Sequence, residues 1–216
     1  MISSPTERNE SNRSFLPLSY EVSMTKIIVF SGNSNTGKTT AINFLYDTFT
    51  QRYPEKKVKK IHESARIYID QHGGGNIEDV HEFERFIINE ETKRLKDLAK
   101  IKQQHEYDLI FIDRTWLDAV IYSYRNLING NITWIDYVSN YHEILVQGRE
   151  LYDHVIFFTT PIKQDNRFPI YNNEHINAVF EHSIRFWYGE KVIVYTNNIF
   201  FQDNLKSTIF GNIFEL

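Results

Sequence analysis

The sequence predicts an α/β fold in which a five-stranded parallel β-sheet is covered by helices on both faces. Four short segments are nearly continuous runs of Ile, Val, Leu and Phe, which is typical of parallel strands buried on both faces. Between them lie stretches whose apolar residues recur every three or four positions, as on one face of a helix. Strands that alternate with helices form right-handed βαβ units, and such units build a single parallel sheet.

Five segments are predicted to be strands. Four are the apolar runs, and the second in chain order is a more polar segment rich in lysine. The basic cluster in and before this second segment is better explained by a solvated strand edge than by a nucleic-acid-binding patch; its members are Lys56, Lys57, Lys59 and Lys60. In order, the predicted strands are Lys26–Phe30, about Lys57–Ile61, Leu109–Asp113, His154–Thr159 and Lys191–Tyr195.

Three longer helices are outlined by apolar periodicity. The first follows the first strand and carries Ile42, Leu45, Tyr46 and Phe49 on one face. The second extends from about Glu78 to Gln104. The third contains the apolar residues from Ile176 to Trp187, and Asn172 or Asn173 is its expected N-cap. The apolar face of the second helix is formed by Val80, Phe83, Ile87, Leu95, Leu98 and Ile101.

The strongest functional motif follows the first strand. Gly32-Asn33-Ser34-Asn35-Thr36-Gly37-Lys38-Thr39-Thr40 matches the P-loop pattern G-x-x-x-x-G-K-[ST], and it stands between a strand and a helix as a P-loop requires. Its glycines allow a tight turn whose N–H groups point at phosphates, and the helix adds the positive end of its dipole. Lys38 is expected to reach the β and γ phosphates of ATP, and the Thr39 hydroxyl is expected to bind Mg²⁺.

A carboxylate fits this phosphate site. The third strand ends in Asp113, and P-loop proteins hold their Mg²⁺ with a carboxylate at the tip of a neighbouring strand. Two other P-loop classes fit less well. Asp113-Arg114-Thr115-Trp116 lacks the glycine of the GTPase switch motif, and residues 196–198 offer no guanine-reading motif. A ring-forming AAA ATPase needs a helical subdomain beyond the sheet, and only residues 196–216 follow the fifth strand.

Three further pieces of sequence, together with the P-loop, resemble a known family. They are His62-Glu63-Ser64-Ala65-Arg66 after strand two, Asp113-Arg114-Thr115-Trp116-Leu117-Asp118-Ala119 after strand three, and Asp165-Asn166-Arg167 beyond strand four. The region from about Thr25 to Tyr195 is similar to the NadR-like ATPase/kinase group of P-loop proteins, which includes ribosylnicotinamide kinase modules and is related to nucleoside and nucleotide kinases. The resemblance implies the three-layer P-loop NTPase fold with strand order 2-3-1-4-5.

The resemblance and the chemistry of phosphoryl transfer together assign roles to the candidate residues. Glu63 and Asp113 follow strands of one parallel sheet, so both should face the same crevice. We assign Glu63 to the acceptor hydroxyl, as orienting group or base, and Asp113 to Mg²⁺, and the sequence leaves open an exchange of these roles. The alternative for Glu63 is a carboxylate that interacts with a helix dipole.

Three more residues are assigned to substrate binding. Arg66 and Arg114 are expected to hold phosphate or acceptor groups, and the alternative for both is a surface ion pair. Asp118 is a candidate for binding sugar hydroxyls, and the alternative is an exposed helix residue. A mobile lid is expected at Thr159–Asn173, because long connections without a helical period are often functional. Arg167 in this lid would act on the transferring phosphoryl group, and the alternative is an ordinary surface loop.

Composition limits the remaining classes of function. The chain has 216 residues, a net charge of −4 and no cysteine, which disfavours a general nucleic-acid or membrane-surface binder and excludes thiol catalysis and disulfides. No apolar run approaches the roughly 20 residues of a membrane span. We therefore expect a soluble cytoplasmic protein, with a surface-packed or poorly structured extension at residues 1–23 and one P-loop kinase-like domain at 24–216.

The predicted function is ATP- and Mg²⁺-dependent phosphoryl transfer to a hydroxyl of a small nucleoside-, nucleotide- or ribosylnicotinamide-like acceptor. Two alternatives stay open. One is a P-loop ATPase or nucleotide sensor that has no small-molecule acceptor. The other is a kinase that acts on nucleic acid, which the acidic net charge disfavours.

Overall fold

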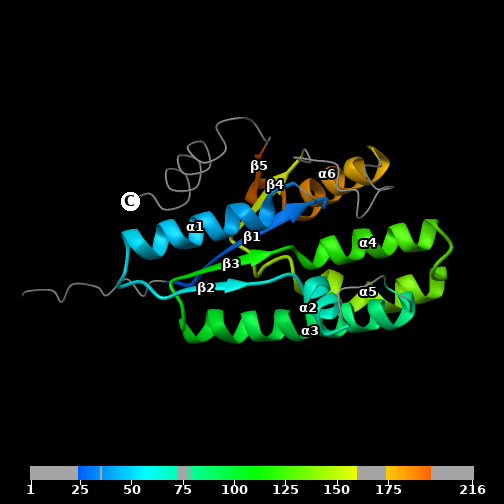
Figure 1. Ribbon diagram of the computed structural model, residues 1–216, viewed down its shortest axis with the longest axis horizontal. Coiled ribbons are helices and arrows are strands. Elements are labelled where there is room, and N and C mark those ends of the chain that lie inside the picture. The colour runs from blue at the N-terminus through cyan, green and yellow to red at the C-terminus, as the bar shows by residue number, and fades with distance from the viewer. Residues whose placement is uncertain (1–23, 35, 73–76, 78, 160–173, 196–216) are drawn as a thin grey trace, which may run out of the picture.

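The computed structural model describes residues 24–34, 36–72, 77, 79–159 and 174–195. The predicted extension at residues 1–23 and all but the first residue of the predicted lid lie outside these ranges. The part described contains one sheet with helices on either side of it (Figure 1).

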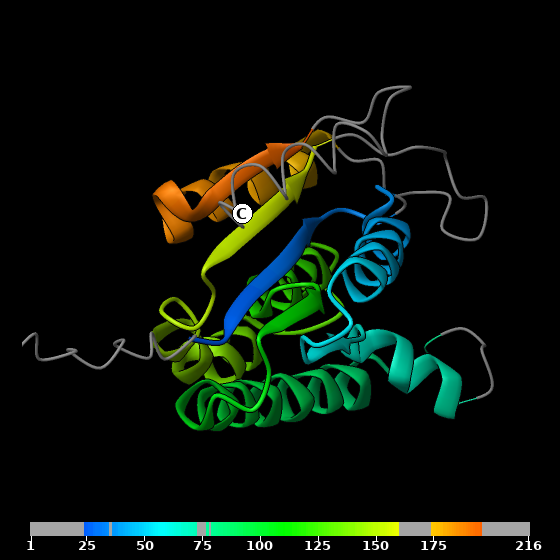
Figure 2. The ribbon, with the colours of Figure 1, turned by 90° about the vertical axis from the view of Figure 1, so that its left-hand side faces the viewer.

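The sheet has five parallel strands in the order β2-β3-β1-β4-β5, as predicted (Figure 2). The strands are β1 (Lys26–Gly32), β2 (Val58–Ile61), β3 (Leu109–Asp113), β4 (His154–Phe158) and β5 (Val192–Tyr195). All five lie within about two residues of the predicted bounds. The largest difference is β1, which continues beyond Phe30 to Gly32 and so carries the sheet directly into the P-loop.

Six α-helices are described. The three longer helices predicted from periodicity are present, and the long one begins at Val80 because Asp79 caps it by accepting from the Glu82 N–H. Two helices between β3 and β4 were not outlined by the sequence analysis. The helices are α1 (Lys38–Arg52), α2 (Ser64–Gln71), α3 (Val80–Gln104), α4 (Trp116–Ile128), α5 (Trp134–Gln147) and α6 (Glu174–Tyr188), and a short 3-10 helix (Gly189–Lys191) precedes β5.

Alternating residues of the strands build two separate cores. On one face of the sheet, Ile28 and Phe30 of β1 pack with Ile42 and Leu45 of α1. On the other face, apolar residues of β1, β3 and β4 pack with α3, α4, α5 and α6, and Trp116 is the largest buried side chain there. The sheet is therefore the middle of three layers, as expected when both faces of parallel strands are buried.

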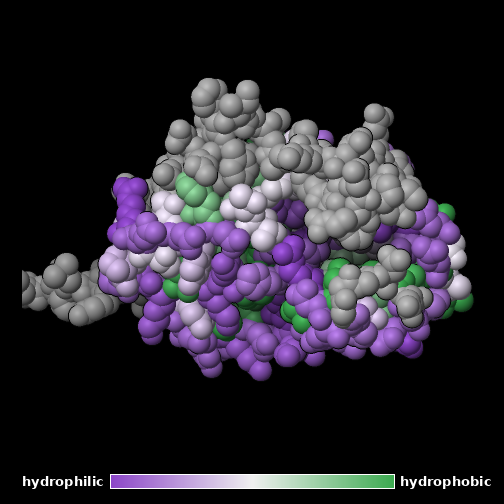
Figure 3. All heavy atoms as spheres, viewed as in Figure 1, coloured by the Kyte–Doolittle hydropathy of each residue, from purple (hydrophilic) through white to green (hydrophobic). Residues whose placement is uncertain are grey.

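The lysine cluster lies in the edge strand β2 and just before it. Lys56 forms an ion pair with Asp108, Lys59 lies over the ring of Tyr107, and Lys60 donates to Asn43. These are contacts of a solvated edge, and the face shown in Figure 3 is largely hydrophilic.

Exposed apolar side chains occur where α4 ends and α5 begins, at Ile128, Trp134, Ile135 and Val138. Among the helices of the described ranges, none is long and apolar enough to cross a membrane.

Candidate active site

The register of the sheet brings the predicted site residues to one edge. Phe30 of β1 pairs with Asp113 of β3, and Ile61 of β2 pairs with Ile112. The P-loop, Asp113 and Glu63 therefore leave three adjacent strands at their carboxyl ends, which is where open α/β sheets bind ligands.

Two glycines shape the P-loop. Gly32 has φ +131°, and a Cβ placed on it would lie 2.5 Å from the carbonyl oxygen of Phe158 on β4. Only glycine fits there, because both the backbone conformation and the close approach exclude a side chain. Gly37 has φ +89° and is the N-cap residue of α1. It contributes no capping side chain, so the first N–H groups of α1 remain available to an anion.

Lys38 points back into this loop. Its Nζ donates to the carbonyl oxygens of Gly32 at 2.8 Å and Asn33 at 2.6 Å, and to Thr36 Oγ1 at 3.1 Å. Burial, together with the nearby charge of Arg114, lowers the pKa of Lys38 to about 7. The loop thus encloses the Lys38 amino group at the centre of the predicted phosphate site, where phosphate charges would stabilise its protonated form.

Thr39 and Asp113 are in direct contact. Thr39 Oγ1 donates to Asp113 Oδ2 at 2.6 Å, and the buried Asp113 Oδ1 has no hydrogen-bond partner within the described ranges. Hydroxyl and carboxylate oxygens are the ligands that Mg²⁺ prefers, and Mg²⁺ usually keeps several waters and substrate phosphates as further ligands. The two side chains therefore fit a divalent cation. No group of three or more His, Asp or Glu able to hold a metal occurs in the part described.

Glu63 and Arg114 form an ion pair beside the P-loop, with 2.5 Å between Glu63 Oε1 and Arg114 Nε. Glu63 is the N-cap residue of α2, as its alternative reading implied, but its side chain does not cap the helix. Burial would raise the pKa of Glu63, yet the charges of Arg114 and Lys38 outweigh burial and hold that pKa below its usual value. Glu63 is accordingly a carboxylate at neutral pH.

Arg114 connects several parts of the site. Its Nη1 donates to the carbonyl of Gly32 at 3.2 Å and to the Tyr122 hydroxyl at 3.3 Å. Its side chain is 11% exposed, so it is not the surface ion pair considered from the sequence. Its backbone has φ +77°, a left-handed conformation that residues other than glycine rarely adopt.

Arg66 is exposed on α2, and its charge contributes to lowering the pKa of Glu63.

Asp118 requires a correction. Its side chain is fully buried, so it is neither the exposed helix residue nor placed to bind sugar hydroxyls directly. Asp118 and Thr115 form a reciprocal capping box at the start of α4, and Asp118 also accepts from Ser31 Oγ at 2.8 Å and from the Gly32 N–H at 3.3 Å. Asp118 therefore links the first turn of α4 to Ser31 and Gly32 at the start of the P-loop. The T-x-x-D pattern ahead of an apolar helix was the signal for this role.

Two residues that the sequence analysis did not select contact the P-loop. The Tyr122 hydroxyl donates to Asn33 Oδ1 at 3.0 Å and lies 3.1 Å from Ser34 Oγ, while the Arg114 guanidinium stands over its ring. Asn33 Nδ2 donates to Asn177 Oδ1 on α6 at 2.8 Å. No local motif marks Tyr122 or Asn177, because their partners lie far away in the chain.

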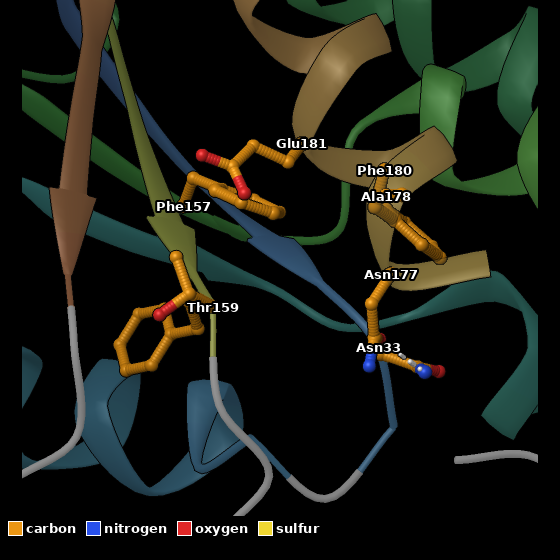
Figure 4. Close-up of a pocket in the computed structure, with 8 residues that line it drawn as sticks. Asn33, Phe157, Thr159, Asn177, Ala178, Phe180 and Glu181 are labelled. Atoms are coloured by element: carbon orange, nitrogen blue, oxygen red, sulfur yellow. Dashed lines mark hydrogen bonds between the residues drawn. The ribbon is translucent and has the colours of Figure 1, made fainter. Parts of the chain in front are cut away.

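A cavity of about 280 Å³ lies beside Asn33. The end of β4 and the first turns of α6 line it, including Thr159 and Glu181, and the Asn33–Asn177 hydrogen bond joins two of its lining residues (Figure 4).

Of the other predicted site residues, Thr36 is buried in the loop and Thr40 is exposed on α1. Asn35 of the P-loop, and Asp165 and Arg167 of the predicted lid, lie outside the described residues.

Comparison with known families identifies a family for most of the chain. Residues 27–174, more than half of the chain, match the family described as "AAA domain". The chain belongs to this AAA domain family. The matched region ends at the start of α6, so the match concerns the P-loop core, and it does not single out the NadR-like group that the sequence resembles. No curated protein matches the sequence.

Solved structures confirm the fold of this AAA domain. A thymidylate kinase from Ehrlichia chaffeensis superimposes with a TM-score of 0.57 at 13% identity, covering 89% of this chain and 99% of that one. A deoxyadenosine kinase from M. mycoides with bound dCTP gives 0.59 at 19% identity, covering 87% and 100%. The same M. mycoides kinase with bound dATP gives 0.56 at 18% identity, again covering 87% and 100%. The likeness extends over nearly the whole of those proteins.

Proposed function

We propose that the protein is a kinase that transfers the γ-phosphoryl group of ATP to a hydroxyl of a small nucleoside-, nucleotide- or ribosylnicotinamide-like acceptor. The observation that carries the proposal is the pairing of Glu63 with Arg114 at 2.5 Å, next to a P-loop and an Asp113–Thr39 pair. An ATPase needs the P-loop and the metal ligands. A carboxylate and a guanidinium held together at the ends of the neighbouring strands β2 and β3 suit an acceptor in addition.

The donor phosphates would be held by the uncapped N–H groups at the start of α1 and by Lys38. Lys38 would exchange its contacts with the loop carbonyls for contacts with phosphate oxygens, and the phosphate charge would keep it protonated. Thr39 and Asp113 would hold Mg²⁺, which supplies neutralisation of the charge on the β and γ phosphates.

Glu63 is suited to orient the acceptor, because its lowered pKa keeps it ionised at neutral pH. It would accept a hydrogen bond from the acceptor hydroxyl and take the proton as the new oxygen–phosphorus bond forms. The bond between the γ-phosphorus and the bridging oxygen breaks, and ADP leaves. Arg114, already placed beside Glu63 and the Gly32 carbonyl, would stabilise charge on the transferring group. Arg66 and the predicted lid residue Arg167 are proposed to add positive charge.

The fold likeness to thymidylate and deoxyadenosine kinases supports a nucleoside- or nucleotide-like acceptor. The test is a panel of acceptors with γ-labelled ATP and Mg²⁺. The panel contains nucleosides, deoxynucleosides, nucleoside monophosphates, ribosylnicotinamide and an oligonucleotide with a free 5′-hydroxyl. A labelled small-molecule product is expected. Release of labelled inorganic phosphate alone would favour an ATPase or sensor, and a labelled oligonucleotide would favour a nucleic-acid kinase.

Glu63→Gln separates acceptor chemistry from donor binding. The amide keeps the size of the side chain and removes its basicity, so the transfer rate should fall roughly 10²- to 10⁴-fold. Affinity for a non-hydrolysable ATP analogue with Mg²⁺, measured by calorimetry, should barely change, whereas Lys38→Ala should weaken that affinity and abolish transfer. Wild-type turnover in Glu63→Gln would contradict the assignment of Glu63 to the acceptor.

A further inference from the structure

A buried ion pair on α3 lies behind the Glu63–Arg114 pair. Glu91 and Arg94, one turn apart, are in contact, and their side chains are only 4% and 7% exposed. An ion pair buried this deeply is weak evidence for stability, because removing two charges from water offsets their attraction. The groups that Glu91 and Arg94 contact indicate a different role for the pair.

Both members of the pair reach residues of the candidate site. Glu91 Oε1 accepts from Ser64 Oγ at 2.7 Å, and Ser64 directly follows Glu63. Arg94 Nη2 donates to the backbone carbonyl of Arg114 at 3.1 Å. Since Arg114 Nε in turn donates to Glu63, the contacts form a closed ring through α2, α3 and the end of β3.

The ring of contacts includes the backbone of Arg114, which has an unfavourable conformation. The left-handed φ of +77° at Arg114 persists only if its surroundings enforce it. The Arg114 N–H donates to the carbonyl of Phe30 at 2.9 Å, and the Arg114 carbonyl accepts from Arg94. Without the second bond the peptide after Arg114 could rotate toward a common conformation and carry the guanidinium away from Glu63.

We propose that Glu91 and Arg94 are positioning residues that hold the Arg114 guanidinium against the Glu63 carboxylate. This inference rests on the proposed function for its catalytic consequence, and on geometry alone for the position of Arg114. Neither residue is placed to touch a substrate, because both are buried beneath the groups that would. A small displacement of a positioned group is enough to lower a reaction rate by about 10²-fold.

The test uses the double variant E91Q/R94M. Removing one partner alone would leave an unpaired buried charge and destabilise the fold, whereas the double variant removes both charges together. The amide oxygen of E91Q can still accept from Ser64, and the methionine of R94M fills most of the arginine volume. The change thus removes both charges of the ion pair and the donor to the Arg114 carbonyl, while it keeps an acceptor for Ser64.

Arg94→Lys is the conservative rescue. In the structure only Nη2 of Arg94 makes hydrogen bonds, and Nε and Nη1 have no partner among the described residues. A lysine ammonium near that place can serve both Glu91 and the Arg114 carbonyl. Glu84→Gln is the matched control, because Glu84 is an equally buried carboxylate two turns earlier on α3. Its partners are Asn126 and Tyr141, outside the ring.

Two measurements are made on each full-length variant. The first is kcat with the acceptor found in the panel, together with KM for ATP. The second is the ¹⁵N–¹H signal of Arg114 Nε, assigned by its loss in Arg114→Lys, which reports the bond to Glu63 without any turnover. In E91Q/R94M we expect kcat to fall roughly 10- to 100-fold with KM for ATP nearly unchanged, and the Nε signal to shift. Arg94→Lys and Glu84→Gln should retain most of kcat and the wild-type signal.

The proposal is overturned by a wild-type Nε signal or a wild-type kcat in E91Q/R94M, or by an equal loss of kcat in Glu84→Gln. Failure of the proposed function is distinguishable from these outcomes. A wild-type protein that transfers no phosphoryl group to any acceptor refutes the kinase, and the Nε signal alone then decides whether Glu91 and Arg94 position Arg114.

Discussion

Replacing Lys38 with methionine tests whether burial of the Lys38 ammonium group in the P-loop lowers the free energy of unfolding. Lys38 is only 5% exposed, and among the described residues its ammonium group contacts two backbone carbonyls and one hydroxyl but no carboxylate. Burial disfavours the charged form, and so does the charge of Arg114. Methionine keeps the length and apolar surface of the side chain while removing the charge.

The magnitude follows from the pKa of Lys38, which falls from 10.5 to about 7 on folding. The difference corresponds to about 5 kcal/mol of stability. Because the folded-state pKa is the lower one, this stability is fully present above pH 10.5 and is lost as the pH falls through 7. Between pH 7 and pH 9 the wild type should gain about 2 kcal/mol from this residue, and the variant should lack that gain.

The assay is urea unfolding followed by tryptophan fluorescence at pH 7, 8 and 9, without nucleotide. The free energy of unfolding of the wild type, relative to Lys38→Met, should rise by about 2 kcal/mol across this range. Lys57→Met, at an exposed lysine near the edge strand, should follow the pH profile of the wild type. Parallel curves for the wild type and Lys38→Met would refute the lowered pKa of Lys38.

Three further predictions concern other parts of the site. Gly32→Ala should lower the free energy of unfolding by at least about 3 kcal/mol, because its Cβ would meet the Phe158 carbonyl; a normal urea midpoint would contradict the loop geometry. Asp118→Asn should cost about 2–4 kcal/mol in the same assay, since one oxygen that accepts buried hydrogen bonds becomes a donor, and an unchanged midpoint would argue against its capping role. Arg167→Ala should lower turnover roughly 10³-fold without changing thermal stability, and unchanged turnover would remove Arg167 from the proposed chemistry.

Much of the fold was readable from local patterns. Continuous apolar runs located the strands because a parallel strand is buried on both faces, and G-x-x-x-x-G-K-T marked the P-loop because its backbone shape requires glycines at fixed positions. Asp113 was found because the end of a strand points to the ligand edge of the sheet. The strand order came from the family resemblance and was confirmed by the structure.

The helices α4 and α5 show what the sequence patterns could not distinguish. Their capping boxes, Thr115–Asp118 and Thr133–Asp136, were present as T-x-x-D patterns, yet Asp118 was interpreted as a substrate ligand. A carboxylate shortly after a strand that ends beside the P-loop has the same appearance in sequence whether it faces a ligand or a helix N-terminus. Only its complete burial and its bonds to Ser31 and Gly32 decided between the two.

The sequence by itself determined the layered α/β fold, the P-loop and the presence of Glu63, Asp113 and Arg114 at one edge of the sheet, because each depends on short-range patterns. The tertiary structure alone decided how these residues are held. Glu91 and Arg94 stand at positions of α3 that periodicity assigns to its buried face, but their partners, Ser64 and the Arg114 carbonyl, are 27 and 20 residues away. Contacts of that kind are fixed by the packing of α3 against α2, α4 and one face of the sheet, and no local pattern encodes them.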